Sequence, residues 1–191
     1  MLGEIMSKQK LVLIGASTGG PGHLRKLLCD IKINNAIVVV AQHMDPMFIP
    51  SFCNQLSKEC HIDIECIEEK IKLENKFYIC KHNTEILKSL NTSINKDAKL
   101  PYSPNINMLF ASATNLCNEI EIMAILLTGI GDDGANGLFE LYKNGAKCIA
   151  ENEESAIVYG MPKRAKEINA SLKTMNLSDI RKELERFLYV F

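Results

Sequence analysis

Three uninterrupted apolar runs constrain the fold of this chain most strongly. They read KLVLIG at 10–15, AIVVVAQ at 36–42 and IMAILLT at 122–128. Short runs of this kind are typical of strands in a parallel sheet that is covered on both faces. The sequence therefore predicts a sheet built around these three segments.

Helical spacing of apolar residues fills the intervals between these runs. We expect a further strand at 146–150, and helices at 21–30, 47–59, 104–119, 135–143 and 178–190. Alternation of strands and helices along the whole chain is typical of a doubly wound α/β fold. The fold class that we predict is α/β, with a mainly parallel sheet and helices on both of its faces.

The segment 61–100 has a different pattern from the rest of the chain. Apolar and polar residues alternate there over short runs such as HIDIECI, KFYICK and TEILKSL. This alternation predicts an antiparallel hairpin region inserted into the α/β frame. No repeat or linker divides the chain, so we expect a single domain over 1–191, with about 1–9 and 184–191 loosely ordered.

Composition excludes several classes of function. The net charge of −1 over 191 residues gives no general basic field for nucleic acid or for an acidic membrane surface. No apolar run approaches the ~20 residues of a membrane span, so we expect no membrane insertion. The seven cysteines include no CxxC pair, so we interpret them as reduced apolar filler in a cytoplasmic protein and not as disulfides or metal ligands. A monomer is the expected state.

Three residue types that belong to one chemistry follow three of the predicted strands. Ser17 follows the first strand, His43 the second, and Asp133 the strand at 122–128. Because the carboxyl ends of parallel strands meet at one edge of a sheet, we expect these side chains to lie close together. A serine hydroxyl is a weak nucleophile until an imidazole takes its proton, and a carboxylate orients that imidazole.

The glycine-rich turn that carries Ser17 leaves alternatives open. GASTG at 15–19 fits the G-x-S-x-G pattern of a nucleophile on a strand-to-helix turn. A phosphate loop is the competing interpretation, but the stretch lacks both the G-x-G-x-x-G spacing and a following Gly-Lys-Ser/Thr. His43 alone could be structural, and Asp132 with Asp133 could form only a turn and helix cap. A nucleotide-binding protein and a non-catalytic binding module are therefore the alternatives, and His23 is assigned no role.

Four motifs, in order, resemble a known family. They are GASTGG at 15–20, AQHM at 41–44, LTGIGDDGA at 127–135, and ENEES followed by VYGMP within 151–162. Together they resemble the catalytic domain of chemotaxis protein-glutamate methylesterase (CheB type) over about residues 10 to 162. The resemblance implies hydrolysis of γ-glutamyl methyl esters on the cytoplasmic helices of methyl-accepting chemoreceptors, with release of methanol. Many members also deamidate receptor glutamines.

The resemblance also implies residue roles and partners. Ser17 matches the nucleophile, His43 the general base and Asp133 the orienting acid. No cofactor and no metal are implied, and a cytoplasmic protein recruited to receptor arrays is expected.

Five further positions are expected at the ester carbonyl or the substrate. They are Thr18, Gly19, Ile130, Gly131 and Met161.

This sequence departs from the family pattern at several places. The family usually has Asn where Asp132 stands and Gln where Glu151 stands. Its usual RPSVD stretch is Ser103-Pro104-Asn105-Ile106-Asn107 here, without the arginine and the acidic residue, so docking of the substrate is expected to differ. Only about ten residues precede the first predicted strand, so we expect no receiver domain and no activation by phosphorylation within this chain.

Overall fold

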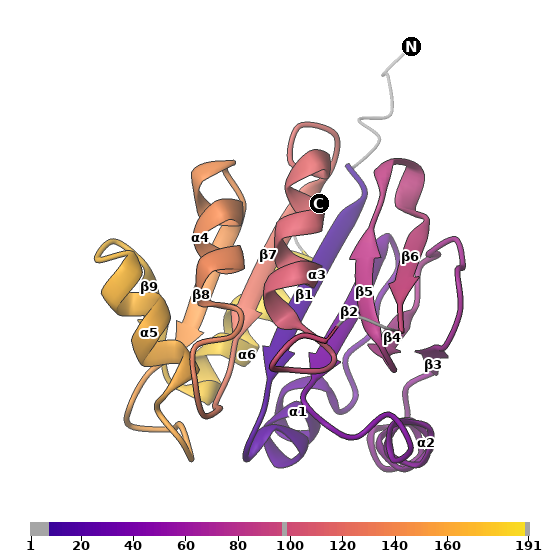
Figure 1. The fold of residues 1–191 in the computed structure, drawn as a ribbon, viewed down its shortest axis with the longest axis horizontal. Helices are drawn as coiled ribbons and strands as arrows, with labels where there is room; N and C mark the ends of the chain where they lie inside the picture. The colour runs from indigo at the N-terminus through magenta and orange to yellow at the C-terminus, as the bar shows by residue number, and fades with distance from the viewer. Residues whose placement is uncertain (1–7, 97–98, 190–191) are drawn as a thin grey trace.

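A parallel β-sheet forms the centre of the molecule (Figure 1). The computed structural model describes residues 8–96 and 99–189. Within these residues the sheet has seven strands in the order β3-β4-β2-β1-β7-β8-β9, and every pair in it is parallel. The strands are β1 (Lys10–Ala16), β2 (Ala36–Gln42), β3 (Ile64–Ile67), β4 (Phe77–Cys80), β7 (Glu121–Leu126), β8 (Lys147–Glu151) and β9 (Lys173–Met175).

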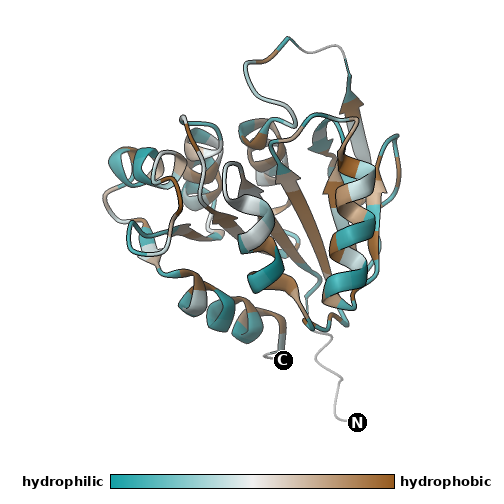
Figure 2. Cartoon of the chain, turned by 90° about the horizontal axis from the view of Figure 1, so that it is seen from below, coloured by the Kyte–Doolittle hydropathy of each residue, from teal (hydrophilic) through white to brown (hydrophobic). Residues whose placement is uncertain are grey.

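Helices cover both faces of this sheet, which confirms the doubly wound fold. One face packs against α1 (Gly20–Leu28), α2 (Ile49–Cys60) and α6 (Leu177–Tyr189). The other packs against α3 (Ile106–Ser112), α4 (Ala135–Lys143) and α5 (Met161–Ile168). Successive side chains of a strand point to opposite faces, so a strand that is buried on both faces must be apolar throughout. Figure 2 shows the result, with apolar strands inside and the polar sides of the helices outside.

The central strand β1 explains why the functional candidates converge. It pairs with β2 on one side and with β7 on the other, so that Ala16 is the partner of Gln42 and Gly15 the partner of Leu126. All three strands run in the same direction, and their carboxyl ends therefore meet at one edge. Residues that follow β1, β2 and β7 lie at that edge.

The middle of the chain corrects one part of the predicted fold. β3 and β4 belong to the main parallel sheet, whereas we predicted antiparallel hairpins there. β5 (Asn83–Ile86) and β6 (Thr92–Asn95), joined through the 3-10 helix η1 (Lys88–Leu90), form an antiparallel hairpin and confirm the inserted hairpin for this part of the segment. β3 lies at the sheet edge, where its first three residues are only partly buried, and a strand in this position can alternate apolar and polar residues as a hairpin strand does.

The helix predicted at 104–119 is shorter in the structure. It consists of α3 and the 3-10 helix η2 (Ala113–Leu116), and the Asn105 side chain caps its start by accepting a hydrogen bond from Met108 N. At the C-terminus, 184–189 are part of α6, while 190–191 and 1–7 lie outside the described residues. None of the helices in the described part of the chain is long and apolar enough to cross a membrane.

One cysteine pair contradicts the expectation that all seven are free. Cys29 and Cys60 form a disulfide between the C-terminal ends of α1 and α2. The two residues are 31 positions apart in sequence, so only the packing of the two helices brings them together. The filler interpretation fits Cys80 and Cys148, because burial raises the pKa of each thiol to about 12.

A buried carboxylate ties α6 to the sheet and gives a stability prediction. Glu183 Oε2 lies 2.7 Å from Lys147 Nζ, and Arg186 Nη1 lies 2.6 Å from Oε1. The hydrogen bond from Lys147 is the largest cause that lowers the Glu183 pKa. Because the Lys147 and Arg186 side chains are themselves exposed, solvent screens these ion pairs, and Glu183→Gln should reduce the free energy of unfolding at pH 7 by roughly 0.5–1 kcal/mol.

The pH dependence of this loss follows from the direction of the pKa shift. A carboxyl whose pKa is lowered by folding stabilises the native state above its unfolded pKa and loses that contribution as the pH falls through the folded value. The difference between wild type and Glu183→Gln should therefore narrow as the pH falls below about 4. Urea unfolding of both proteins at neutral and at acid pH measures this difference in the free energy of unfolding. A difference that does not depend on pH would show that the ionised Glu183 carboxylate does not stabilise the fold.

Candidate active site

The turn after β1 holds Ser17 in a largely buried position. Ser17 is 7% exposed and lies between the last residue of β1 and the start of α1. Its N–H donates to the Thr128 carbonyl oxygen at 2.9 Å, and its carbonyl oxygen accepts from Gly20 N at 2.8 Å. Gly19 has φ +83°, a conformation that favours glycine. Hydrogen bonds therefore fix the backbone of residues 17–19, the serine turn, to the end of β7 and to the start of α1.

Gln42 connects the serine turn to the next strand. Its Nε2 donates to the carbonyl oxygens of both Ser17 and His43, each at 3.0 Å. The His43 N–H in turn donates to the Ala16 carbonyl oxygen at 2.9 Å, which extends the β1–β2 pairing by one residue. Ser17 and His43 are thus held on adjacent strand ends by the backbone and by one amide side chain.

The imidazole of His43 is fixed by two contacts. His43 Nε2 lies 2.7 Å from Asp133 Oδ2, and the ring stacks on Tyr102 with centroids 5.0 Å apart and planes 4° apart. Because Nε2 faces the carboxylate, Nδ1 is the nitrogen that remains for a proton from serine. Among the described residues, Ser17 Oγ makes no hydrogen bond to His43 in this state. Such bonds are often long without substrate and shorten when it binds.

Asp133 is buried and accepts hydrogen bonds from the backbone as well as from His43. Ile106 N donates to Oδ2 at 2.7 Å, while Asn107 N and Gly134 N each donate to Oδ1 at 3.0 Å. Four donors stabilise the ionised carboxylate and fix its orientation. The contacts from 106 and 107 are made by the main chain, so they are retained although this stretch departs from the family pattern in its side chains.

Neighbouring Asp132 differs from Asp133 in its surroundings. Asp132 is exposed, whereas Asp133 is 1% exposed and holds His43. Of the two carboxylates, the structure brings only Asp133 to the imidazole. The described part of the chain contains no group of three or more His, Cys, Asp or Glu side chains that could hold a metal ion.

The positions predicted to line the substrate lie around this edge in different ways. In the described residues, the N–H groups of Thr18, Gly19, Ile130 and Gly131 donate to no hydrogen bond. Met161 differs, because its N–H already donates to the Gly129 carbonyl oxygen at 2.9 Å. Its fully buried side chain packs against Gly129.

Several residues of the site carried no recognisable signal in the sequence. Tyr102, which stacks on His43, belongs to a stretch without periodicity. Thr128 contacts Ser17 and Thr18. Its carbonyl oxygen accepts from Ser17 N, and its Oγ1 donates to the Thr18 carbonyl oxygen at 2.9 Å. His23, to which we assigned no role, is buried and paired with Glu151.

Gly129 provides a test of how tightly this edge is packed. A Cβ added there would lie 2.6 Å from Ser17 Cβ and would also meet the Met161 side chain. We expect Gly129→Ala to displace Ser17 and to slow its reaction with a fluorophosphonate probe by ~10²-fold.

Gly22→Ala is the matched control for this substitution. A Cβ at Gly22 in α1 would meet nothing within 4 Å. This variant should keep the labelling rate of wild type and gain roughly 0.5–1 kcal/mol of stability. Equal labelling rates in the two variants would show that the space beside Ser17 is not limiting.

Comparisons with known proteins agree with one another. The chain is 32% identical over 189 residues to the protein-glutamate methylesterase/protein-glutamine glutaminase of Salmonella typhi, a match that covers 95% of this chain and 54% of that protein. It is 35% identical over 174 residues to the protein of the same name from Caldanaerobacter subterraneus subsp. tengcongensis, covering 86% and 47%. The chain thus spans about half the length of the curated relatives that it matches.

A solved structure and a family model complete the comparison. The CheB methylesterase catalytic domain of Thermotoga maritima superposes with a TM-score of 0.82 at 25% identity, covering 95% of this chain and 99% of that one. The family model for CheB methylesterase matches residues 12–184. With most of the chain matched by sequence and by structure, we conclude that this protein belongs to the CheB methylesterase family.

Proposed function

We propose that this chain is a single catalytic domain that hydrolyses γ-glutamyl methyl esters on chemoreceptors and releases methanol. The observation that carries the proposal is the His43–Asp133 pair, 2.7 Å apart, at the strand end next to the one that carries Ser17. Membership of the family supports the substrate class.

In the first half of the proposed reaction, Ser17 Oγ attacks the ester carbonyl carbon. His43 Nδ1 accepts the hydroxyl proton as the new C–O bond forms, and Asp133 stabilises the imidazolium through Nε2–H. The free N–H groups of Thr18, Gly19, Ile130 and Gly131 are the candidates to stabilise the oxyanion of the tetrahedral intermediate. Collapse of that intermediate breaks the bond to the methoxy oxygen, which takes the proton from His43 and leaves as methanol.

In the second half, water hydrolyses the glutamyl-serine ester. His43 accepts a proton from water as its oxygen attacks the acyl carbon, and then returns a proton to Ser17 Oγ. The products are regenerated enzyme and a glutamic acid side chain on the receptor, which releases its proton to solvent and becomes the carboxylate. Over the two halves, one ester and one water give one carboxylate, one methanol and one proton, with Ser17, His43 and Asp133 returned to their starting forms.

Exposed apolar side chains beside the site support a protein substrate. Met47 and Phe48 follow His43 in the chain and are 71% and 56% exposed, while Ile130 and Ile157 are 64% and 67% exposed. Ile157 also packs against the serine turn at Gly19. We propose that these side chains contact the receptor helix around the esterified glutamate, and that the protein acts in the cytoplasm at receptor arrays.

Deamidation of receptor glutamines is the second activity that we propose. The curated relatives carry both activities in their names. The same serine would attack a carboxamide carbon, and ammonia would leave in place of methanol. Ammonia release from receptors with glutamine at the modified positions tests this activity separately.

Methanol release from membranes that hold methylated chemoreceptors tests the main proposal. Purified protein should release methanol from these membranes and none from membranes with unmethylated receptors. Labelling of the protein by a fluorophosphonate without methanol release would indicate a serine hydrolase with another ester substrate. Absence of both, together with thermal stabilisation by a nucleotide, would favour the phosphate-loop alternative.

A further inference from the structure

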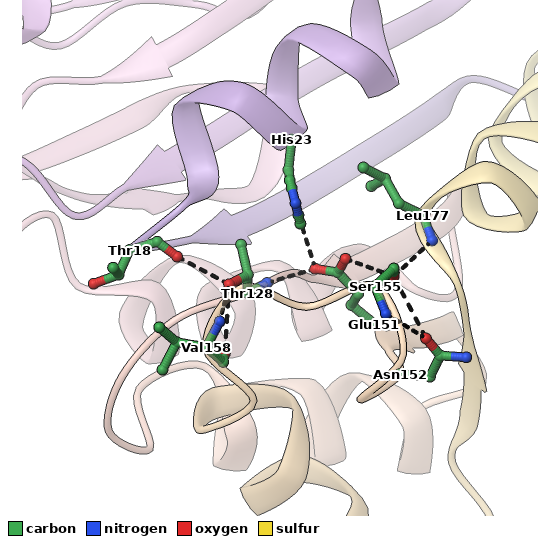
Figure 3. Close-up of polar contacts among 8 residues, drawn as sticks. All are labelled: Thr18, His23, Thr128, Glu151, Asn152, Ser155, Val158 and Leu177. Carbon is green, nitrogen blue, oxygen red and sulfur yellow. Dashed lines mark hydrogen bonds and ion pairs between the residues drawn. The ribbon is translucent and has the colours of Figure 1, made fainter.

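Glu151, at the carboxyl end of β8, has a buried carboxylate beneath the serine turn. It is 0% exposed and has three hydrogen-bond donors (Figure 3). Oε2 accepts from Thr128 N at 2.8 Å and from His23 Nδ1 at 3.1 Å, and Oε1 accepts from Ser155 Oγ at 2.8 Å. A buried carboxylate without such partners would be costly, so this environment is built around the acceptor.

His23 is matched to this carboxylate. An ionised carboxylate only accepts hydrogen bonds, so His23 must carry a hydrogen on Nδ1 when it contacts Glu151. His23 comes from α1, which begins directly after the serine turn, and it is 4% exposed. The pair therefore connects the end of β8 to the helix that Ser17 precedes.

The contact to Thr128 leads directly to the nucleophile. Thr128 uses its N–H for Glu151, its carbonyl oxygen for Ser17 N at 2.9 Å and its hydroxyl for the Thr18 carbonyl oxygen at 2.9 Å. The same hydroxyl accepts from Val158 N at 2.9 Å. Fixing the Thr128 N–H thus fixes the direction in which its other groups point toward the serine turn.

We propose that Glu151 is a positioning residue for the reaction, acting on Ser17 through Thr128, with His23 as its buried partner. The inference rests on the proposed function only in that Ser17 is a nucleophile. Loss of the Glu151 acceptor frees the Thr128 amide and lets the serine turn shift relative to His43. A shift of about 1 Å at a nucleophile is enough to slow reaction ~10²-fold.

Glutamine, the usual residue at this position in the family that the sequence resembles, can meet the same requirements. Its carbonyl oxygen can accept from Thr128 N and from His23 Nδ1, and its NH₂ can donate to Ser155 Oγ. Leucine has a similar volume and no acceptor. Aspartate keeps the charge but is one methylene shorter, so it cannot reach Thr128 N and His23 together. The three variants therefore distinguish the effect of losing the hydrogen-bond acceptor from the effects of changing side-chain volume or charge.

The rate of Ser17 labelling by a fluorophosphonate is the first measurement. Glu151→Leu should lower the second-order rate constant by ~10²-fold, and Glu151→Asp by ~10-fold, whereas Glu151→Gln should stay within ~3-fold of wild type. Hydrogen exchange of the Ser17 and Thr128 amides should become faster in the order of the rate losses. If the leucine variant does not fold, the rate loss of Glu151→Asp alone tests the inference.

Glu183→Leu is the matched control, and it tests whether loss of stability alone slows the labelling of Ser17. Glu183 is also a buried glutamate with hydrogen-bonded partners, but it contacts Lys147 at the opposite end of β8 and lies outside the route to Ser17. This variant should be less stable and yet label within ~3-fold of wild type. Equal rate losses for Glu183→Leu and Glu151→Leu, or a wild-type rate in both Glu151→Leu and Glu151→Asp, would overturn the inference.

The probe also separates this inference from the proposed function. If wild type labels but releases no methanol from receptor membranes, the receptor assignment fails while the rate order among Glu151 variants still decides the positioning role. If the Ser17 hydroxyl of wild type does not react with the probe at all, no activated nucleophile exists and both proposals are overturned.

Discussion

Ser17→Ala is expected to lower methanol release from methylated receptor membranes by at least ~10³-fold, because loss of a triad nucleophile leaves only binding and oxyanion stabilisation. The substitution removes one oxygen, and the backbone contacts of the turn to Thr128, Gly20 and Gln42 remain. The melting temperature should therefore change little. Methanol release and a thermal melt on the same preparation measure the two effects.

The control for this variant is a serine away from the site. Ser51 is exposed on α2, and Ser51→Ala should leave methanol release and probe labelling unchanged. Retention of activity in Ser17→Ala above ~10% of wild type would exclude Ser17 as the nucleophile. The proposal of a serine hydrolase site at the carboxyl ends of β1, β2 and β7 would then be wrong.

Asp133→Asn is expected to have the larger combined effect, on both rate and stability. The methanol-release rate should fall by ~10⁴-fold, because an amide no longer selects the tautomer of His43 that leaves Nδ1 free for serine. Unlike the carboxylate, the amide presents an NH₂ group to at least one of the four donors that point at residue 133. An unsatisfied buried donor pair of this kind should cost about 1–3 kcal/mol of stability.

The neighbouring acid provides the matched control for Asp133→Asn. Asp132→Asn makes the same chemical change one residue away at an exposed position, and it installs the residue that the family usually has there. Its rate should stay within ~3-fold of wild type, as expected of a surface substitution. If the two variants lose activity equally, the carboxylate that orients His43 has been assigned wrongly.

The sequence contains enough information to predict the centre of the fold and the place of the site. β1, β2 and β7 are buried on both faces, so their apolar runs are unambiguous, and parallel pairing then brings their carboxyl ends together. The direction of the edge strand β3 is not predicted correctly. It depends on parallel pairing with β4, and the residues of β3 alone do not indicate that partner.

Contacts between distant segments account for the remaining differences. The Cys29–Cys60 disulfide depends on how α1 packs beside α2, and neither cysteine has a metal or redox motif around it. The role of His23 becomes visible only when the end of β8 is placed next to α1, 128 residues away in sequence. Periodicity predicts which side of a helix is buried, but not which buried polar groups meet.

The way in which Asp133 is held ties the site to the course of the backbone at 106 and 107. Its donors at 106 and 107 are main-chain amides, which any residue other than proline supplies. The carboxylate therefore depends on the course of the backbone at 106 and 107, which the buried Ile106 side chain and the Asn107 contact to Gly137 N in turn hold in place. Because Tyr102 from the adjoining segment stacks on His43, this stretch also borders the proposed site. A substitution that shifts this backbone would thus disturb Asp133 even though no side chain of 106 or 107 contacts its carboxylate.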